Sequence, residues 1–290
     1  MNSLPQWLKK RITINEAFFD TRKTLSELSI NTVCESGRCP NISECFSSGS
    51  VTFMILGRTC TRSCGFCSVK KTGLPETVDT QEPERIADCI KRLGIKYAVV
   101  TSVTRDDLDD GGSGQFVKTV EAIRRAVEDV TVELLIPDLA GDPDPIRSVA
   151  LSGADVIGHN IETIKRLYPF IRKEADYYRS LGVLRSIKEI DPRVLTKSAI
   201  LAGLGETKEE LLEVMMDLRR VGCDILAVGQ YLSPSKENYP VDRFVPPEEF
   251  EFYKEAGLDM GFRNVSAAPF VRSSYHAEEE YDKCHAAAFS

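Results

Sequence analysis

The chain has 290 residues, an apolar content of 42% and a formal net charge of −7 at pH 7. The length suits one large α/β barrel or two modest domains, and the acidic balance argues against the clustered basic face of a nucleic-acid-binding protein. No apolar run approaches the roughly 18 residues needed to cross a bilayer, and the N-terminus lacks the apolar core of a secretory signal, so we expect a soluble protein with no membrane or nucleic-acid partner.

The cysteines are numerous and unevenly placed. Six of the nine lie between residues 34 and 67. A secreted protein would pair its cysteines, and nine is an odd number. Such clustering is typical of a metal site in a reducing compartment rather than of a disulfide framework. We therefore expect a cytoplasmic protein.

Residues 1–50 form an N-terminal extension with a first cysteine triad, Cys34, Cys39 and Cys45. Three thiols within twelve residues predict a cradle for an iron–sulfur cluster that lacks one ligand. A disulfide with a spare thiol, or a zinc site completed from elsewhere, are the alternatives. Ligand softness alone favours Cys284 as the missing ligand and ranks serine last. The candidates near the C-terminus are Ser273, Ser274, His276, Cys284 and His285.

From residue 51 to residue 245, short β-rich runs alternate with segments of helical periodicity. This alternation predicts a parallel sheet that right-handed crossovers form into a barrel or a doubly wound sheet. A full barrel needs eight strand–helix units, so six units predict an α/β fold, a partial (β/α)6 TIM-like barrel. The expected strands are 51–57, 97–103, 131–136, 155–159, 197–201 and 225–230. The expected helices are 82–93, 114–128, 145–151, 176–190 and 208–221.

A second triad, Cys60, Cys64 and Cys67, follows directly on the first expected strand. In parallel α/β folds the chemistry gathers at the carboxyl ends of strands, where this loop emerges. Three thiolates on a four-iron cluster leave one iron open for chemistry. Structural zinc prefers four ligands in paired knuckles, and an electron-transferring ferredoxin needs four cysteines, so both alternatives fit this spacing poorly.

Residues 246–290 begin at the Pro246-Pro247 break and form a C-terminal extension. They lie outside the strand–helix alternation, as do residues 1–50. We expect the two extensions to cover the open face of the barrel that residues 51–245 build.

The spacing of the second triad resembles the signature of the radical S-adenosylmethionine (radical SAM) superfamily. The resemblance implies that the methionine part of the cofactor chelates the open iron and that one electron from the cluster releases a 5′-deoxyadenosyl radical. Polar groups at later strand ends are then expected to bind the cofactor, with Asn160 or Glu162 on the ribose and Arg185 on the methionine carboxylate. The full expected set is Thr101, Ser102, Asn160, Glu162 and Arg185.

The two triads together with a C-terminal Arg-Ser-Ser-Tyr are similar to the lipoyl synthase family. The similarity covers most of the chain and is carried by segments 34–41, 100–112, 158–163 and 271–277. It implies that Ser274 is the fourth ligand of an auxiliary 4Fe–4S cluster on the first triad. The expected catalytic groups are accordingly Cys60, Cys64, Cys67 and Ser274.

The same resemblance implies a radical SAM sulfurtransferase that inserts sulfur at C6 and C8 of a protein-bound octanoyl-lysine. Its cofactors would be two 4Fe–4S clusters and S-adenosylmethionine, two molecules per lipoyl group, with sulfur taken from the auxiliary cluster. Its partners would be octanoylated lipoyl carrier domains, namely 2-oxoacid dehydrogenase E2 subunits and the glycine cleavage H protein. A reductant such as ferredoxin or flavodoxin and an iron–sulfur carrier protein are also implied.

Two other functions are alternatives. One is a different radical SAM sulfur-inserting enzyme, of the biotin-synthase-like or methylthiolating type. The first triad argues against the former, and the latter usually carries an added nucleic-acid-binding domain. The other alternative is a non-catalytic metal-binding module.

Overall fold

Seven parallel strands form one sheet in which each strand pairs with its neighbours in chain order. The computed structural model describes residues 4–71 and 73–286. The strands are β1 (Thr52–Ile55), β2 (Tyr97–Ser102), β3 (Thr131–Leu135), β4 (Val156–Gly158), β5 (Leu195–Ala202), β6 (Ile225–Gln230) and β7 (Asn264–Ala268). Because β1 and β7 are the two edges, the curled sheet is an open barrel.

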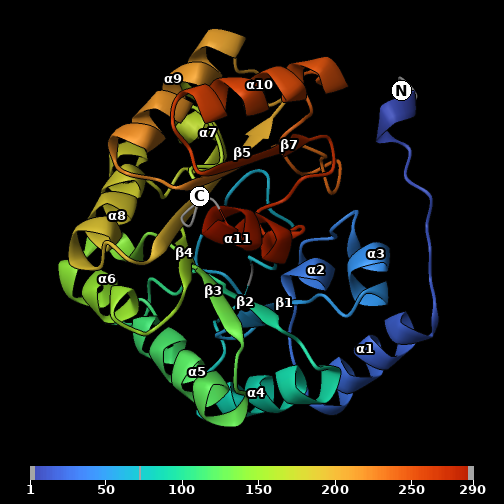
Figure 1. Ribbon diagram of the computed structural model, residues 1–290, viewed down its shortest axis with the longest axis vertical. Helices are drawn as coiled ribbons and strands as arrows, with labels where there is room; N and C mark the ends of the chain where they lie inside the picture. The colour runs from blue at the N-terminus through green and yellow to red at the C-terminus, as the bar shows by residue number, and fades with distance from the viewer. Residues whose placement is uncertain (1–3, 72, 287–290) are drawn as a thin grey trace.

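Helices connect successive strands and form a ring around them (Figure 1). Six strand–helix units, from β1–α4 to β6–α10, confirm the predicted α/β partial barrel. The helices are α1 (Glu16–Glu27), α2 (Val33–Ser36), α3 (Ile42–Ser47), α4 (Glu82–Leu93), α5 (Ser113–Ala126), α6 (Pro143–Ala150), α7 (Tyr168–Ile171), α8 (Tyr177–Ile190), α9 (Lys208–Arg220), α10 (Pro247–Asp259) and α11 (Ala277–Ala286). Three short 3-10 helices are η1 (Gln6–Leu8), η2 (Leu139–Gly141) and η3 (Lys165–Leu167). In the part of the chain that the structure describes, no helix combines the length and apolar character of a bilayer span.

Helix α4 shows how the local sequence sets these elements. Helical spacing predicts an apolar stripe of Ile86, Cys89, Ile90 and Leu93, of which the first three are buried and Leu93 is partly buried. The helix ends at Gly94, whose φ of 66° is the left-handed conformation that glycine adopts without strain. Cys89 is therefore a core residue, and the helix stays bound to the sheet through its apolar face.

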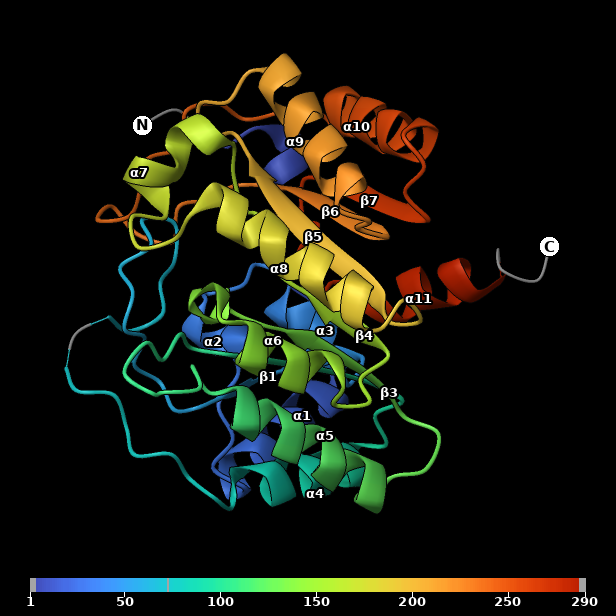
Figure 2. The same ribbon diagram turned by 90° about the vertical axis from the view of Figure 1, so that its left-hand side faces the viewer.

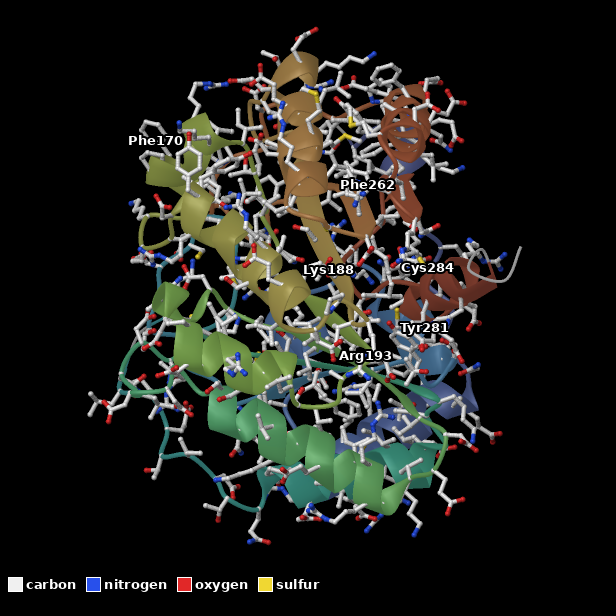
Figure 3. All side chains as sticks on the ribbon, turned by 60° about the vertical axis from the view of Figure 1, so that its left-hand side comes forward. Phe170, Lys188, Arg193, Phe262, Tyr281 and Cys284 are labelled. Carbon is white, nitrogen blue, oxygen red and sulfur yellow. The ribbon has the colours of Figure 1, made fainter. Side chains whose placement is uncertain are left out.

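The two terminal segments fill the parts that the barrel leaves open. In Figure 1, α2 and α3 lie on the open side, between β1 and β7. Helix α11 lies in the middle of the ring, and Figure 2 shows it at the opposite end of the barrel from the loop after β1. Its residues Tyr281 and Cys284 (Figure 3) pack against Tyr97 and Leu195, the first residues of β2 and β5. Thus α11 covers the amino ends of the strands, and the carboxyl ends are left for chemistry.

Strand β7 comes from residues expected to lie outside the alternation. It runs parallel to β6, with Asn264 opposite Ile225. The structure therefore adds a seventh strand to the six that the sequence predicts. After β7, residues 269–276, which we name the strap, lead to α11.

Candidate functional site

The loop after β1 carries Cys60, Cys64 and Cys67, as the sequence predicts. All three are free thiols. The N–H of Gly65 donates to the carbonyl of Ile171 at 2.7 Å, which holds the middle of the loop against α7. The loop thus presents its cysteines at the carboxyl end of the barrel in a fixed backbone path.

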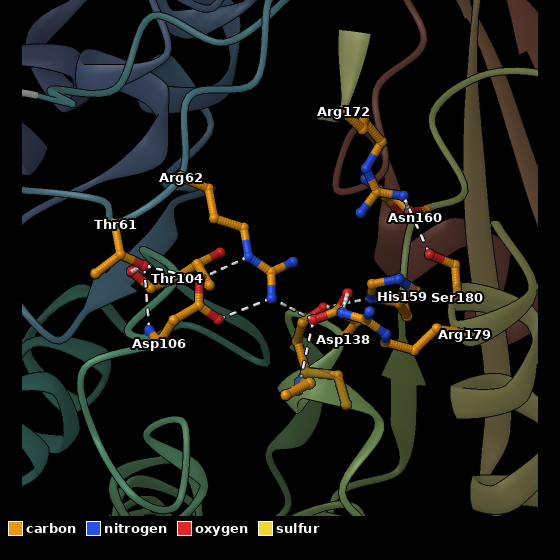
Figure 4. Close-up of polar contacts among 12 residues, drawn as sticks. Thr61, Arg62, Thr104, Asp106, Asp138, His159, Asn160, Arg172, Arg179 and Ser180 are labelled. Carbon is orange, nitrogen blue, oxygen red and sulfur yellow. Dashed lines mark hydrogen bonds and ion pairs between the residues drawn. The ribbon is translucent and has the colours of Figure 1, made fainter. Parts of the chain in front are cut away.

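Arg62 anchors this loop to two strand ends, as Figure 4 shows. It donates from Nε and Nη2 to Asp106, beyond β2, at 2.8 Å each, and from Nη2 to Asp138, beyond β3, at 2.7 Å. Burial acts to raise the pKa of Asp138, but the hydrogen bond and charge of Arg62, together with the nearby charges of His159 and Arg179, lower it overall. The ion pair therefore ties the residues between Cys60 and Cys64 to the barrel.

The first triad surrounds a pocket on the open side of the barrel. Cys34 lies on α2, Cys39 follows it, and Cys45 lies on α3. All three line a pocket of about 290 Å³ together with Thr52 and Ser274. The hydroxyl of Thr52 on β1 donates to Ser274 Oγ at 2.8 Å. The strap thus places a serine oxygen beside the three thiols.

The other candidates for a fourth ligand differ in position. Cys284, the choice by softness alone, packs against β4, β5 and β6 at the amino end of the barrel, and His285 lines a surface pocket there with it. Ser273 is buried but does not line the pocket of the triad, whereas His276 does. Ser274 and His276 are therefore the two candidates that line a pocket with all three thiols, whereas Ser273 lines the larger cavity with Cys34 and Cys39.

Gly229 explains how the strap passes so close to the sheet. A Cβ at this position of β6 would lie 2.0 Å from the carbonyl oxygen of Val271. Only glycine permits this approach without a backbone shift. The close passage brings Arg272 and Ser274 to the pocket of the first triad.

A cavity of about 400 Å³ joins the two triads. Cys34 and Cys39 from the first triad, Cys67 from the second and Ser274 all line it. Much of the rest of its wall is apolar and comes from strands and loops, including Val33, Phe66, Leu135, Leu201, Ala227 and Val271. A site of this volume and character suits a small apolar group with a few polar contacts.

The residues expected to bind a cofactor separate into two groups. Asn160 and Glu162 line the cavity, and Asn160 Nδ2 donates to Glu162 Oε1 at 3.0 Å. Thr101 and Ser102 end β2 outside the lining of this cavity, and Thr101 donates to the carbonyl of Leu135. Arg185 is exposed on the outside of α8, so it does not reach the cavity.

Arg172 is a site residue that the sequence analysis missed. It is buried, and its Nη1 donates to the carbonyl oxygens of Asn160 at 3.0 Å and Ile161 at 3.2 Å. Its charge lies near Cys64 and Glu162. It directly follows the four-residue helix α7. A helix this short shows no apolar periodicity from which the burial of Arg172 could be predicted.

Four of the triad thiols, Cys34, Cys45, Cys64 and Cys67, are in environments that favour the protonated form. Burial raises the pKa of Cys34 and Cys64 to about 11, and burial together with neighbouring thiols raises the pKa of Cys45 to about 12. Burial also raises the pKa of Cys67. Metal binding at these sites therefore releases protons.

The donor sets fit iron–sulfur clusters better than single ions. Among residues 4–71 and 73–286, no three His, Cys, Asp or Glu side chains converge so that one metal ion could bind them. A cubane cluster takes one thiolate per iron, so its ligands stand around a group larger than an ion. Each triad offers three soft sulfur donors for such a cluster.

Solved structures share this fold at low sequence identity. The chain is similar to the crystal structure of SuiB from Streptococcus suis bound to S-adenosylmethionine, with a TM-score of 0.59 and 10% identity over 79% of this chain and 53% of that one. It is similar to methylornithine synthase with a TM-score of 0.54 and 17% identity over 81% of this chain and 68% of that one. These likenesses concern the partial barrel alone.

Comparison of amino-acid sequences identifies the family as well as the fold. Residues 54–218 match the radical SAM superfamily. The chain is 51% identical to a lipoyl synthase of Rubrobacter xylanophilus over 95% of this chain and 86% of that one. Lipoyl synthases of Caldicellulosiruptor saccharolyticus and Geobacter metallireducens are 52% and 53% identical, over 95% and 94% of this chain and 96% and 95% of their own. The chain therefore belongs to the lipoyl synthase family of radical SAM enzymes.

Proposed function

We propose that this chain inserts sulfur at C6 and C8 of a protein-bound octanoyl-lysine, taking the sulfur from an auxiliary 4Fe–4S cluster held by Cys34, Cys39, Cys45 and Ser274. One observation supports this most directly: residues of both triads line one cavity with a largely apolar wall. Such a wall suits a saturated acyl chain. The carbons of that chain are unactivated, so they do not react with acids, bases or nucleophiles.

Cys60, Cys64 and Cys67 would hold the other 4Fe–4S cluster. Together with S-adenosylmethionine this cluster supplies a radical that can abstract hydrogen from an unactivated carbon, and two insertions require two molecules of S-adenosylmethionine. The chain itself binds and orients the reactants. Asn160 or Glu162 would hydrogen-bond the ribose hydroxyls, and their position on the cavity wall supports this assignment.

Ser274 has a chemical reason to be the fourth ligand of the auxiliary cluster. An alkoxide matches iron less well than a thiolate, so it is easier to displace. A cluster that gives up sulfur benefits from one weak ligand. The position of Ser274 beside Thr52 supports this role, because the Thr52 hydroxyl can stabilise the displaced oxygen.

The proposed partners follow from the substrate. They are octanoylated carrier domains of the E2 and H-protein types, a ferredoxin or flavodoxin as reductant, and an iron–sulfur carrier protein, and cytoplasm is the compartment that suits them. The division into an N-terminal cluster segment (1–50), a barrel (51–245) and a C-terminal ligand segment (246–290) is part of the same proposal.

An anaerobic assay with an octanoyl-lysine peptide, dithionite and S-adenosylmethionine, read by mass spectrometry, tests the proposal. We expect a product with two added sulfurs. Cys34→Ser is expected to retain cleavage of S-adenosylmethionine and to yield no thiolated product, whereas Cys60→Ser is expected to lose both. A clustered wild-type chain that adds no sulfur, or a Cys34→Ser variant that loses both activities, would contradict the proposal. A one-sulfur product that gains no second sulfur with excess S-adenosylmethionine, or a product formed on a different substrate, would favour another sulfur-inserting enzyme.

A further inference from the structure

Lys10 lies at a junction of three segments that are far apart in the sequence. It belongs to the extended stretch between η1 and α1, which in Figure 1 runs along the outside of α3 on the open side of the barrel. Its Nζ donates to Asn41 Oδ1 at 2.7 Å and pairs with Glu44 Oε2 at 2.6 Å. It also lies over the rings of Phe270 and Tyr275, 5.2 Å and 5.0 Å from their centroids.

The partners of Lys10 also bind one another. Tyr275 Oη donates to Glu44 Oε1 at 2.8 Å, and Asn41 Nδ2 donates to the carbonyl of Phe270 at 2.7 Å. His276 Nε2 lies 3.5 Å from Glu44. One ammonium group therefore neutralises a carboxylate of the α3 segment while its charge attracts two aromatic rings of the strap.

The positions of these partners in the sequence carry the inference. Glu44 directly precedes Cys45, and Tyr275 directly follows Ser274. Glu44 binds both flanking segments at once, since it pairs with Lys10 through Oε2 and accepts from Tyr275 through Oε1. On the pocket side, Ser274 has a hydrogen bond from one hydroxyl, that of Thr52.

We infer that Lys10 is a positioning residue that holds Ser274 against the cradle of Cys34, Cys39 and Cys45. This inference rests on the proposed function, since it assigns a support to the ligand proposed there. A weak ligand adds little binding energy of its own, so its geometry must come from the residues around it. Lys10 supplies that geometry by fixing the neighbours of Cys45 and Ser274 relative to each other.

Other contacts would keep the N-terminal segment in place without Lys10. Asn15 Nδ2 donates to the carbonyl of Ser47 at 3.1 Å, and Ser47 Oγ donates to the carbonyl of Thr13 at 3.3 Å. Substitution of Lys10 therefore acts on the strap and the cradle rather than on the docking of the whole segment.

The test compares Lys10→Met with Lys9→Met in the reconstituted full-length chain, because Lys9 is the exposed neighbour on the same stretch. We expect Lys10→Met to cleave S-adenosylmethionine within about twofold of wild type and to fall from about eight irons per chain towards about four. Mössbauer spectra are expected to lose the signal of the serine-ligated iron. Lys10→Arg, which keeps the charge, is expected to recover most of the iron, and Lys9→Met to match wild type.

A second readout uses the chain before cluster assembly. Hydrogen exchange of the amides of residues 271–276 is expected to be about tenfold faster in Lys10→Met than in Lys9→Met. Eight irons, an unchanged Mössbauer spectrum and unchanged exchange in Lys10→Met would overturn the inference and leave the proposed function standing. Loss of both clusters would reduce Lys10 to a residue of general stability and also overturn it. A wild-type chain with only four irons would refute the auxiliary cluster, and the inference with it.

Discussion

Glu162 adopts a left-handed backbone conformation, with φ of 65°, on the wall of the cavity. A residue with a side chain keeps this conformation only when its surroundings enforce it. Strand β5 holds the backbone of Glu162, whose N–H donates to Ala199 and whose carbonyl accepts from Leu201. Arg172 supports the same turn through hydrogen bonds to the carbonyl oxygens of Asn160 and Ile161. Arg172 therefore acts through the turn that carries Asn160 and Glu162.

This support predicts a difference between two arginines. Arg172→Lys shortens the side chain and withdraws the Nη1 donor from the carbonyl oxygens of Asn160 and Ile161, and since hydrogen bonds to charged groups contribute about 1.5–3 kcal/mol, we expect the KM for S-adenosylmethionine to rise about tenfold or more. Arg185→Lys, on the exposed side of α8, is expected to change nothing. Steady-state kinetics of S-adenosylmethionine cleavage check both. Equal effects of the two substitutions would contradict the role given to Arg172.

At this scale, the sequence predicts the two triads well because each is contiguous. Cys60, Cys64 and Cys67 need only a loop to come together. A fourth ligand or a cofactor contact is distant from the triads in sequence and approaches them only in the folded chain. Local sequence spacing therefore does not identify it. Ligand softness pointed to Cys284, yet that residue packs in the core beneath α11. Family similarity, and not periodicity, singled out Ser274.

At the scale of elements, the loop after β1 is held in place by residues that follow other strands, Asp106 beyond β2 and Asp138 beyond β3. Asp138 is fully buried, accepts from Arg62 at 2.7 Å and from Arg179 at 3.3 Å, and caps η2. Asp138→Asn removes one of the two carboxylates that pair with Arg62, and since the pair with Asp106 remains, we expect a cost below the value of about 3–5 kcal/mol for a buried charge left without a partner. The cost falls on the loop that carries Cys60 and Cys64.

We therefore expect Asp138→Asn to lose the radical cluster and S-adenosylmethionine cleavage while the cluster on the first triad survives. This is the reverse of the pattern expected for Lys10→Met. Iron content and the electron paramagnetic resonance spectrum of the reduced protein check it. Asp109→Asn, in the exposed turn beyond β2, is the matched control. Cleavage by Asp138→Asn at the rate of the control would show that the loop holds its shape without this ion pair.

The predicted elements of the barrel were accurate where the sequence is rich in β-branched and apolar residues. Strand β6, Ile225–Gln230, is buried throughout and was predicted with its observed bounds. Strand β7 was missed because Asn264–Ala268 contains one β-branched residue, Val265, among small and polar ones. Pairing with β6 stabilises this strand, and the local sequence of residues 264–268 does not indicate that pairing.

At the scale of the whole molecule, the two ends of the barrel are linked through the strap. Helix α11 begins three residues after Ser274, so its docking at the amino end fixes one end of the strap. A buried ion cluster contributes to this docking. Lys197 on β5 lies 2.7 Å from Glu280 on α11 and 3.2 Å from Glu133 on β3, and Tyr97 Oη donates to Glu133 at 2.6 Å.

This ion cluster has one cation, Lys197, for two carboxylates, Glu133 and Glu280. The imbalance determines how stability changes when Lys197 is substituted. Burial raises the pKa of Glu133, and the charge of Lys197 opposes that rise. Lys197→Met leaves two buried carboxylates facing each other, so we expect the free energy of unfolding to fall by about 3–5 kcal/mol near neutral pH. Lys254→Met, which breaks the exposed pair with Glu251, is expected to cost less than about 1 kcal/mol.

The pH dependence of this loss separates buried charge from lost packing. A carboxyl group whose pKa is higher in the folded chain than in the unfolded chain binds its proton more readily in the fold, so the fold gains stability as pH falls towards that pKa. The loss in Lys197→Met is therefore expected to be smaller at about pH 5 than at about pH 8, since protonation removes the uncompensated charge. Urea unfolding of the chain without iron–sulfur clusters, at the two pH values, measures this loss of unfolding free energy. A loss that is the same at both would mean that Lys197 contributes by filling space, and that α11 is held at the barrel by its apolar face alone.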